Sequence, residues 1–243
     1  MRRRRTVLLA LALLLTTVCT VLGSVGYAVK REPDFYSRSP CPADWDTRQK
    51  AARMVTRVLD LKNDIRSKSE WGDTFTADDL NCFFVENMGH KGGFSSLLPE
   101  RFHSPRVAID GDRLKIGFRY GEGFWSTVIS LELRVWLVAD ETNVVAVELC
   151  DLRAGGLPFG SQSILDWIAE AARDSNVEVT WYRHKSNPVG LFRFYANQPQ
   201  PPTQILTLEV KDGTFTVAGR SASDQPPGAQ TALAPLLKGL ASE

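Results

Sequence analysis

The sequence is poor in the residues from which metal sites and nucleophilic sites are built. Its 243 residues include three histidines and four cysteines, and neither Cys-x-x-Cys nor His-Glu-x-x-His occurs. Zinc sites need such paired ligands, so the scattered His90, His103 and His184 indicate no metal centre. The Gly-x-Ser-x-Gly turn that exposes a catalytic serine is also missing. We therefore expect the protein not to be an enzyme and to hold no metal or cofactor.

Glycine-rich phosphate-binding loops are missing too. The stretch RAGGLPFGSQSILDWI, from 153 to 168, has the Gly-x4-Gly spacing of a P-loop, but Ser161 stands where the phosphate-binding lysine is needed. The Gly-x-Gly-x-x-Gly pattern of dinucleotide-binding folds does not occur. We interpret Gly155 and Gly156 as a turn, and Ser161 or Ser163 as the cap of the helix that follows.

A large excess of charge of either sign is lacking. The formal net charge is +1, from 29 basic and 28 acidic residues. Arg2 to Arg5 supply four of the positive charges, so the remaining residues carry a net charge of −3. A nearly neutral body has no basic patch of the kind that binds phosphates, and we expect no nucleic-acid partner.

The longest apolar run follows directly after the four arginines. Residues 6–29 contain no charged side chain and would form a helix of about 36 Å. Because a bilayer core is about 30 Å thick, we predict a cytoplasmic basic stub at 1–5 and a transmembrane anchor, or uncleaved signal, at 6–29. Basic residues stay in the cytoplasm, so the bulk of the chain is expected outside the cytoplasm, next to the bilayer. The alternative is export followed by signal cleavage after Gly-Tyr-Ala, 26–28.

Cysteine is scarce in the rest of the chain. Outside the apolar segment 6–29, only Cys41, Cys82 and Cys150 occur. An extracytoplasmic compartment permits a disulfide, and three cysteines allow at most one internal pair. Cys41 lies in a linker at 30–45 that contains proline and serine, and it can pair with Cys82 or with Cys150. The alternative is that Cys82 and Cys150 are small buried apolar residues.

Two amphipathic helices are predicted at the start of an extracytoplasmic α+β domain, which we place at 46–221. From 47 to 68, apolar residues recur at steps of three and four, which predicts a helix with one apolar face. Thr76 and Asp79 approximate a capping box at the start of a second helix, whose apolar stripe contains Leu80, Phe83, Phe84 and Met88. The residues at 222–243 are expected to form a C-terminal tail or a short helix.

After residue 105 the apolar period changes to two, which is typical of strands. One hairpin is predicted over 105–120, with its turn at Asp110-Gly111, and another around Asp212-Gly213. Further strands are predicted at 123–138 and 144–152, and near 177–183, 204–210 and 214–219. A helix is predicted at 161–174. Helices followed by a meander of strands predict an α+β fold in which one curved antiparallel sheet packs on amphipathic helices.

The run at 123–138 leads to our hypothesis about function. Its odd positions are almost all apolar, whereas its even positions include serine, glutamate and arginine. A partly covered sheet would leave a groove for a hydrophobic ligand, a lipid or a lipid-linked glycan. The side chains expected to line it are Trp125, Ile129, Leu131, Leu133 and Val135, with Phe83, Phe84 and Trp167 nearby. If the face is fully covered, the domain is instead a non-enzymatic interaction or scaffolding module with an envelope protein as partner.

Three stretches of the chain also carry a resemblance to a known group. They are Trp-x3-FTADDLN (Trp71 and 75–81), LRAGGLPFGSQSILDWI (152–168) and LTLEVKDGTFTV (206–217). Their order resembles that of the single-pass YpmS-like proteins, which are similar to LmeA-like envelope proteins and to tubular lipid-binding (TULIP-like) domains.

The resemblance implies a highly curved antiparallel sheet wrapped on helices, and binding of a lipid or a lipid-linked glycan. The matching positions imply a scaffold role and no activity; they are Leu80, Asn81, Phe84, Leu157, Pro158, Ile164 and the segment from Val210 to Phe215. The chain departs from the pattern in its several tryptophans and in the proline-rich segment 198–202.

Overall fold

The structure, a computed structural model, describes residues 2–38, 44–87, 101–160, 162–196, 198 and 201–221. Its helices are α1 (Arg2–Lys30), α2 (Asp34–Arg38), α3 (Trp45–Ser67), α4 (Ala77–Asn87) and α5 (Gln162–Asp174), with a 3-10 turn, η2, at Gly123–Trp125. Its strands are β1 (Glu70–Thr76), β2 (Phe102–Asp110), β3 (Arg113–Tyr120), β4 (Thr127–Leu137), β5 (Val144–Ala154), β6 (Leu157–Pro158), β7 (Glu178–His184), β8 (Asn187–Arg193), β9 (Thr203–Lys211) and β10 (Thr214–Ser221).

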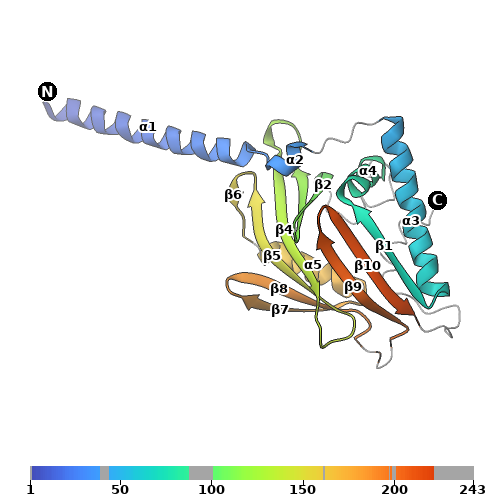
Figure 1. The fold of residues 1–243 in the computed structure, drawn as a ribbon. Coiled ribbons are helices and arrows are strands. Elements are labelled where there is room, and N and C mark those ends of the chain that lie inside the picture. Colours follow the sequence, from blue (N-terminus) through green and yellow to red (C-terminus); the bar gives the residue numbers. More distant parts are fainter. Residues whose placement is uncertain are drawn as a thin grey trace.

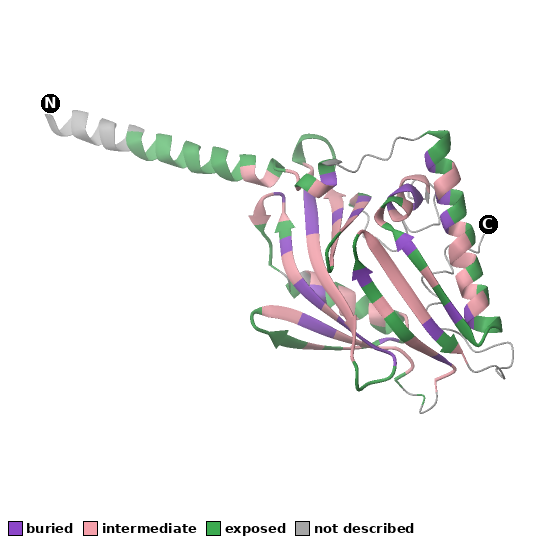
Figure 2. Cartoon of the chain, viewed as in Figure 1, coloured by how far each residue is buried: buried purple, intermediate pink, exposed green. Residues whose placement is uncertain are grey.

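Helix α1 projects as a single rod from one end of a body built from two sheets (Figure 1). Within it, the segment Leu13–Lys30 is long and apolar enough to cross a membrane, and none of this segment is buried inside the protein. Figure 2 shows the described part of the rod exposed almost to the point where it meets the body.

The larger sheet is antiparallel and has the strand order β2-β3-β4-β5-β8-β7, with β6 paired to β5. This confirms the predicted α+β class with a large antiparallel sheet. The register between β4 and β5 shifts after Glu132, because Glu132 pairs with Asp151 while Leu133 pairs with Leu149. Cys150 is therefore the extra residue of a β-bulge, which bends the strand and increases its twist.

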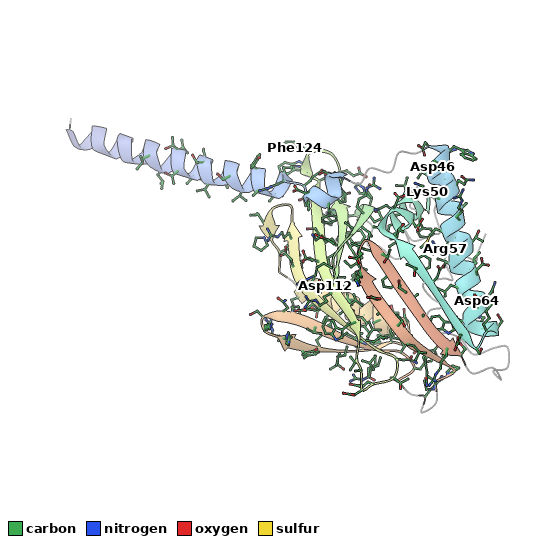
Figure 3. The ribbon with its side chains drawn as sticks, in the orientation of Figure 1. Asp46, Lys50, Arg57, Asp64, Asp112 and Phe124 are labelled. Atoms are coloured by element: carbon green, nitrogen blue, oxygen red, sulfur yellow. The ribbon has the colours of Figure 1, made fainter. Side chains whose placement is uncertain are left out.

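A second, three-stranded sheet has the order β1-β10-β9 and is covered by α3 and α4. Met54, Phe75 and Phe83 are buried together in the core between these elements. Arg57 of α3 crosses to the sheet, where its guanidinium binds Asp73, contacts Asp79 at 3.4 Å and lies 4.9 Å from the centre of the Phe75 ring (Figure 3).

Two buried asparagines connect the large sheet to the second sheet and to its covering helix α4. Asn81 of α4 binds the backbone of Val107 in β2 twice, because its Nδ2 donates to the carbonyl at 2.7 Å and its Oδ1 accepts from the N–H at 2.8 Å. Asn143, in the turn between β4 and β5, donates to Thr203 O at 2.6 Å and accepts from Ile205 N at 2.8 Å. Each amide side chain thus satisfies backbone groups that a buried strand edge would otherwise leave unpaired.

Most local predictions are confirmed. The predicted helix at 47–68 is α3, and the capping box starts α4 as expected: Asp79 N donates to Thr76 Oγ1 at 3.0 Å and Thr76 N donates to Asp79 Oδ2 at 3.2 Å. Both Asp-Gly hairpin turns form, with Gly111 and Gly213 at positive φ.

Other segments differ from the prediction. The run 123–138 is not one strand, because η2 precedes β4. Strands β1 and β8 and the two-residue strand β6 were not predicted. Within the expected linker at 30–45, α2 forms and buries Tyr36 against the large sheet. The predicted tail at 222–243 lies outside the described residues.

Candidate functional site

One side of the large sheet is apolar across its three central strands. Residues directly opposite each other on paired strands point to the same face, so the register identifies its members. They are Leu114, Ile116 and Phe118 of β3, Ile129, Leu131, Leu133 and Val135 of β4, and Val147, Leu149 and Leu152 of β5. We call this set the apolar face.

Helix α5 covers the apolar face only in part. Its Leu165 is buried in one cluster with Ile129, Leu149 and Leu152, and the other seven members of the face are half-buried. Figure 2 shows this intermediate burial along most of β4. A helix of 13 residues is about 20 Å long and about 10 Å wide, whereas β4 extends about 36 Å and six strands span about 24 Å. One helix therefore covers about a quarter of the sheet, and β9 adds contacts with β4.

A buried donor lies beside the same cluster. Trp181 of β7 packs against it, and the Trp181 ring meets Phe192 edge to face at 6.2 Å between centroids. Its Nε1 is buried and has no hydrogen-bond partner among the described residues. Because a buried indole N–H usually finds an acceptor, this group offers one unused hydrogen bond at the margin of the apolar face.

The opposite side of the sheet is charged. Arg134 contacts Asp112 at 2.7 Å and Glu148 at 3.8 Å, and Arg113 contacts Glu132 at 3.3 Å. Figure 3 shows Asp112 beside the strands of the large sheet. A hollow of about 380 Å³ opens on this side. Charged side chains line most of it: Arg31, Glu32 and Asp34 from the segment after α1, and Lys115, Glu132 and Arg153 from the large sheet.

The last turn of α1 is bound into the domain. Gly156 N donates to Ala28 O at 2.7 Å, and Thr127 Oγ1 donates to Val29 O at 2.6 Å. A Cβ atom built on Gly155 would lie 2.1 Å from Val29 O, so only glycine allows this approach. The two glycines that we interpreted as a turn therefore also seat the end of α1.

Helix α2 continues this joint. Phe35 and Tyr36 pack where Gly117 has no side chain, since a Cβ there would lie 2.7 Å from the Tyr36 ring. The Tyr36 hydroxyl donates to Ser104 O at 2.8 Å, and burial raises the pKa of Tyr36 above 10.0 although Arg119 opposes the shift. Arg119 also pairs with Glu32 at 2.5 Å, and this ion pair raises the pKa of Arg119.

An exposed aromatic turn lies beside the end of α1. Phe124 and Trp125, in η2, are 77% and 86% exposed, and their rings meet edge to face at 5.4 Å. Lys30 Nζ lies 4.8 Å from the centre of the Phe124 ring and donates to Ser126 O at 2.9 Å. Figure 3 shows Phe124 at the place where the rod meets the body.

The structure places the predicted lining residues in three different environments. Ile129, Leu131, Leu133 and Val135 belong to the apolar face. Trp125 does not, because the glycines at 121 and 123 turn the chain out of the strand before β4 begins. Phe83 and Phe84 pack in the other core, with Met54 and Phe75, and Trp167 on α5 is 39% exposed.

The two domain cysteines that the structure describes carry no assignable chemistry. Cys82 is buried and its sulfur lies 4.0 Å from Asp78 Oδ1, while Cys150 is a free, half-buried thiol whose pKa is raised by burial. The predicted pairing partner, Cys41, lies outside the described residues. Among the residues that the structure describes, no group of three or more His, Cys, Asp or Glu side chains could hold a metal ion.

Sequence reasoning did not identify two parts of the site. The joint between α1 and the domain depends on contacts between residues about 100 or more apart, although the glycine pair at 155–156 was a visible signal. The aromatic turn was read as part of a strand, although Gly121 and Gly123 marked a break. Compared with known proteins, the chain gives no significant match to a family model, to a curated protein or to a solved structure.

Proposed function

We propose that the chain is a membrane-tethered extracytoplasmic protein that holds a hydrophobic ligand, of the lipid class, against the apolar face. In this proposal α1 spans the bilayer with Arg2 to Arg5 in the cytoplasm, and the two-sheet domain stands on the other side.

The observation that carries the proposal is the incomplete burial of the apolar face. In a sealed core, the central strands of a sheet bury their apolar side chains fully, yet Leu131, Leu133 and Val135 on β4 are all half-buried. An acyl chain laid on these side chains would gain about 0.8 kcal/mol for each methylene removed from water. The unused Nε1–H of Trp181 would suit a carbonyl oxygen of such a ligand.

The seating of α1 favours an uncleaved anchor over a cleaved signal. Cleavage after Ala28 would cut the helical turn whose carbonyls accept hydrogen bonds from Gly156 and Thr127. The bond would have to be cut before the domain folds around it. The resemblance to YpmS-like and LmeA-like proteins, which implies lipid or lipid-linked glycan as ligand, supports the same function.

Photo-crosslinking tests the proposal in the intact chain. The full-length protein would be placed in nanodiscs whose phospholipids carry a diazirine on one acyl chain, illuminated, and digested for mass spectrometry. We expect adducts on peptides covering 114–118 and 129–137 in addition to adducts on α1. Val135→Asn should reduce the adducts on β4, whereas the control Arg134→Gln, on the opposite side of the same strand, should not.

Adducts confined to α1 and the turn at 123–125 would refute ligand binding on the apolar face. They would favour the alternative, an interaction or scaffolding module whose envelope partner covers that face. The intact mass of the purified protein tests the anchor separately, because loss of residues 1–28 would show signal cleavage.

A further inference from the structure

Exposed aromatic side chains gather at the end of the domain from which α1 projects. Phe124 and Trp125 lie there in η2, and Phe159 follows β6 and is 45% exposed. Both segments flank the last turn of α1, because Thr127 binds Val29 O and Gly156 binds Ala28 O. Tyr27, on that turn, is 78% exposed.

Basic side chains accompany the aromatic ones. Lys30 lies over the Phe124 ring. The turn of the β7–β8 hairpin points to the side of the body from which α1 projects (Figure 1), and it carries Arg183, His184 and Lys185, all exposed. Aromatic rings at the level of lipid headgroups, with basic residues beside them, are typical of surfaces that rest on a membrane, particularly an anionic one.

We propose that Phe124, Trp125, Phe159 and Lys30 form a membrane foot, which inserts its rings into the headgroup region of the bilayer that α1 crosses. This inference rests on the proposed function, since it takes α1 as a membrane span. The occupant is lipid and not a second protein, because the foot surrounds the point where an apolar helix enters the body. A soluble partner would have to share that space with the bilayer.

The foot would place one end of the apolar face next to the bilayer. Thr127 opens β4 next to the foot, and Ile129 follows two residues later on the apolar face. The strand therefore leads from the headgroup region into the domain, and an acyl chain would reach the apolar face without crossing open water.

Tryptophan fluorescence can test the foot, because residues 6–29 contain no tryptophan and all six tryptophans of the chain lie at or after residue 45. The full chain would be placed in nanodiscs of phosphatidylcholine and phosphatidylglycerol, with or without bromine on the acyl chains near the ester groups. Subtracting the spectrum of Trp125→Phe from that of the wild type isolates the emission of Trp125. Trp45→Phe is the matched control, because Trp45 is 73% exposed but begins α3, away from α1.

The emission of Trp125 should shift to the blue, lose most of its intensity in brominated nanodiscs and resist quenching by iodide. The emission of Trp45 should remain red-shifted, open to iodide and indifferent to bromine. If Trp125 behaves like Trp45, the foot is refuted. Quenching of both by bromine would also refute it, because the domain would then lie on the bilayer with another surface.

This result is independent of ligand binding on the apolar face. A quenched Trp125 with no diazirine adducts on β4 would keep the foot and reject the ligand. Adducts on β4 with a water-exposed Trp125 would keep the ligand and reject the foot.

Discussion

Replacing Asn81 with leucine tests how α4 is held to the large sheet. The Asn81 side chain is 4% exposed and makes both of its hydrogen bonds to Val107, which is itself 4% exposed. Leucine has a similar size and a good helix propensity, but it leaves the N–H and the C=O of Val107 buried without partners. Each orphaned group costs about 1–3 kcal/mol, so we expect a loss of about 2–6 kcal/mol, partly offset by the apolar burial of leucine.

The loss can be measured as a change in thermal unfolding. For a domain of this size, 1 kcal/mol lowers Tm by about 2–4 °C, which gives a decrease of roughly 4–24 °C for the full range. The full chain in nanodiscs would be heated while near-ultraviolet circular dichroism is recorded. Asn63→Leu is the control, because Asn63 is exposed on α3.

Asn81→Asp gives the reasoning a sharper test. The carboxylate keeps an acceptor for Val107 N, but it sets a second oxygen against Val107 O, which only a proton can bridge. Folding should therefore raise the pKa of this carboxyl, so the variant should be more stable at acid pH and lose that stability as pH rises through the folded pKa. Equal melting of Asn81→Leu and wild type, or an Asn81→Asp variant indifferent to pH relative to wild type, would refute the account.

Three further predictions follow from the joints of the fold. Asn143→Ala should cost about 2–6 kcal/mol, measured by the same melting experiment, because Thr203 O and Ile205 N lose their partner. Gly155→Val should release the end of α1, seen as faster amide exchange at Gly156, since its Cβ would overlap Val29 O. Tyr36 should ionise above pH 10.0, and its raised pKa means that stability present below that pH is lost as pH rises further; Tyr36→Phe should abolish this loss in alkaline unfolding curves.

Local chemistry explains which elements could be predicted. Some signals depend only on residues a few positions apart, so they can be recognised in the sequence. The capping box of Thr76 and Asp79 and the two Asp-Gly turns are of this kind. Strand β1 was hidden because Asp73 occupies an inward position between Trp71 and Phe75. That position is tolerated because Arg57, on a different element, pairs with the carboxylate.

Strand β8 was hidden for another reason. Pro188 and Gly190 argue against an interior strand, yet β8 lies between β5 and β7. Pro188 precedes Val189, the first residue of β8 that pairs with β5, so its missing N–H removes no hydrogen bond from that ladder.

Sequence alternation predicted the centre of the apolar face but not the surroundings of that face. Alternation along β4 correctly grouped Ile129, Leu131, Leu133 and Val135, because adjacent strand positions must face opposite sides. The sequence could not show that Phe83 belongs to a different core, since both cores are apolar. The alternation continues through the turn at Trp125, so it concealed the break that Gly121 and Gly123 mark.

The seating of α1 on Gly155 and Gly156 has a mechanical consequence. If a flexible linker joined the span to the domain, the tilt of the helix would not affect the orientation of the domain. Because α1 is held by Gly155 and Gly156, a change in the tilt of α1 turns the domain with it. A span longer than the local hydrocarbon thickness tilts to fit, and interfacial aromatic anchors help to set that tilt. If α1 crosses the bilayer as proposed, a change in bilayer thickness would rotate the whole sheet, and with it the direction in which β4 meets the lipid.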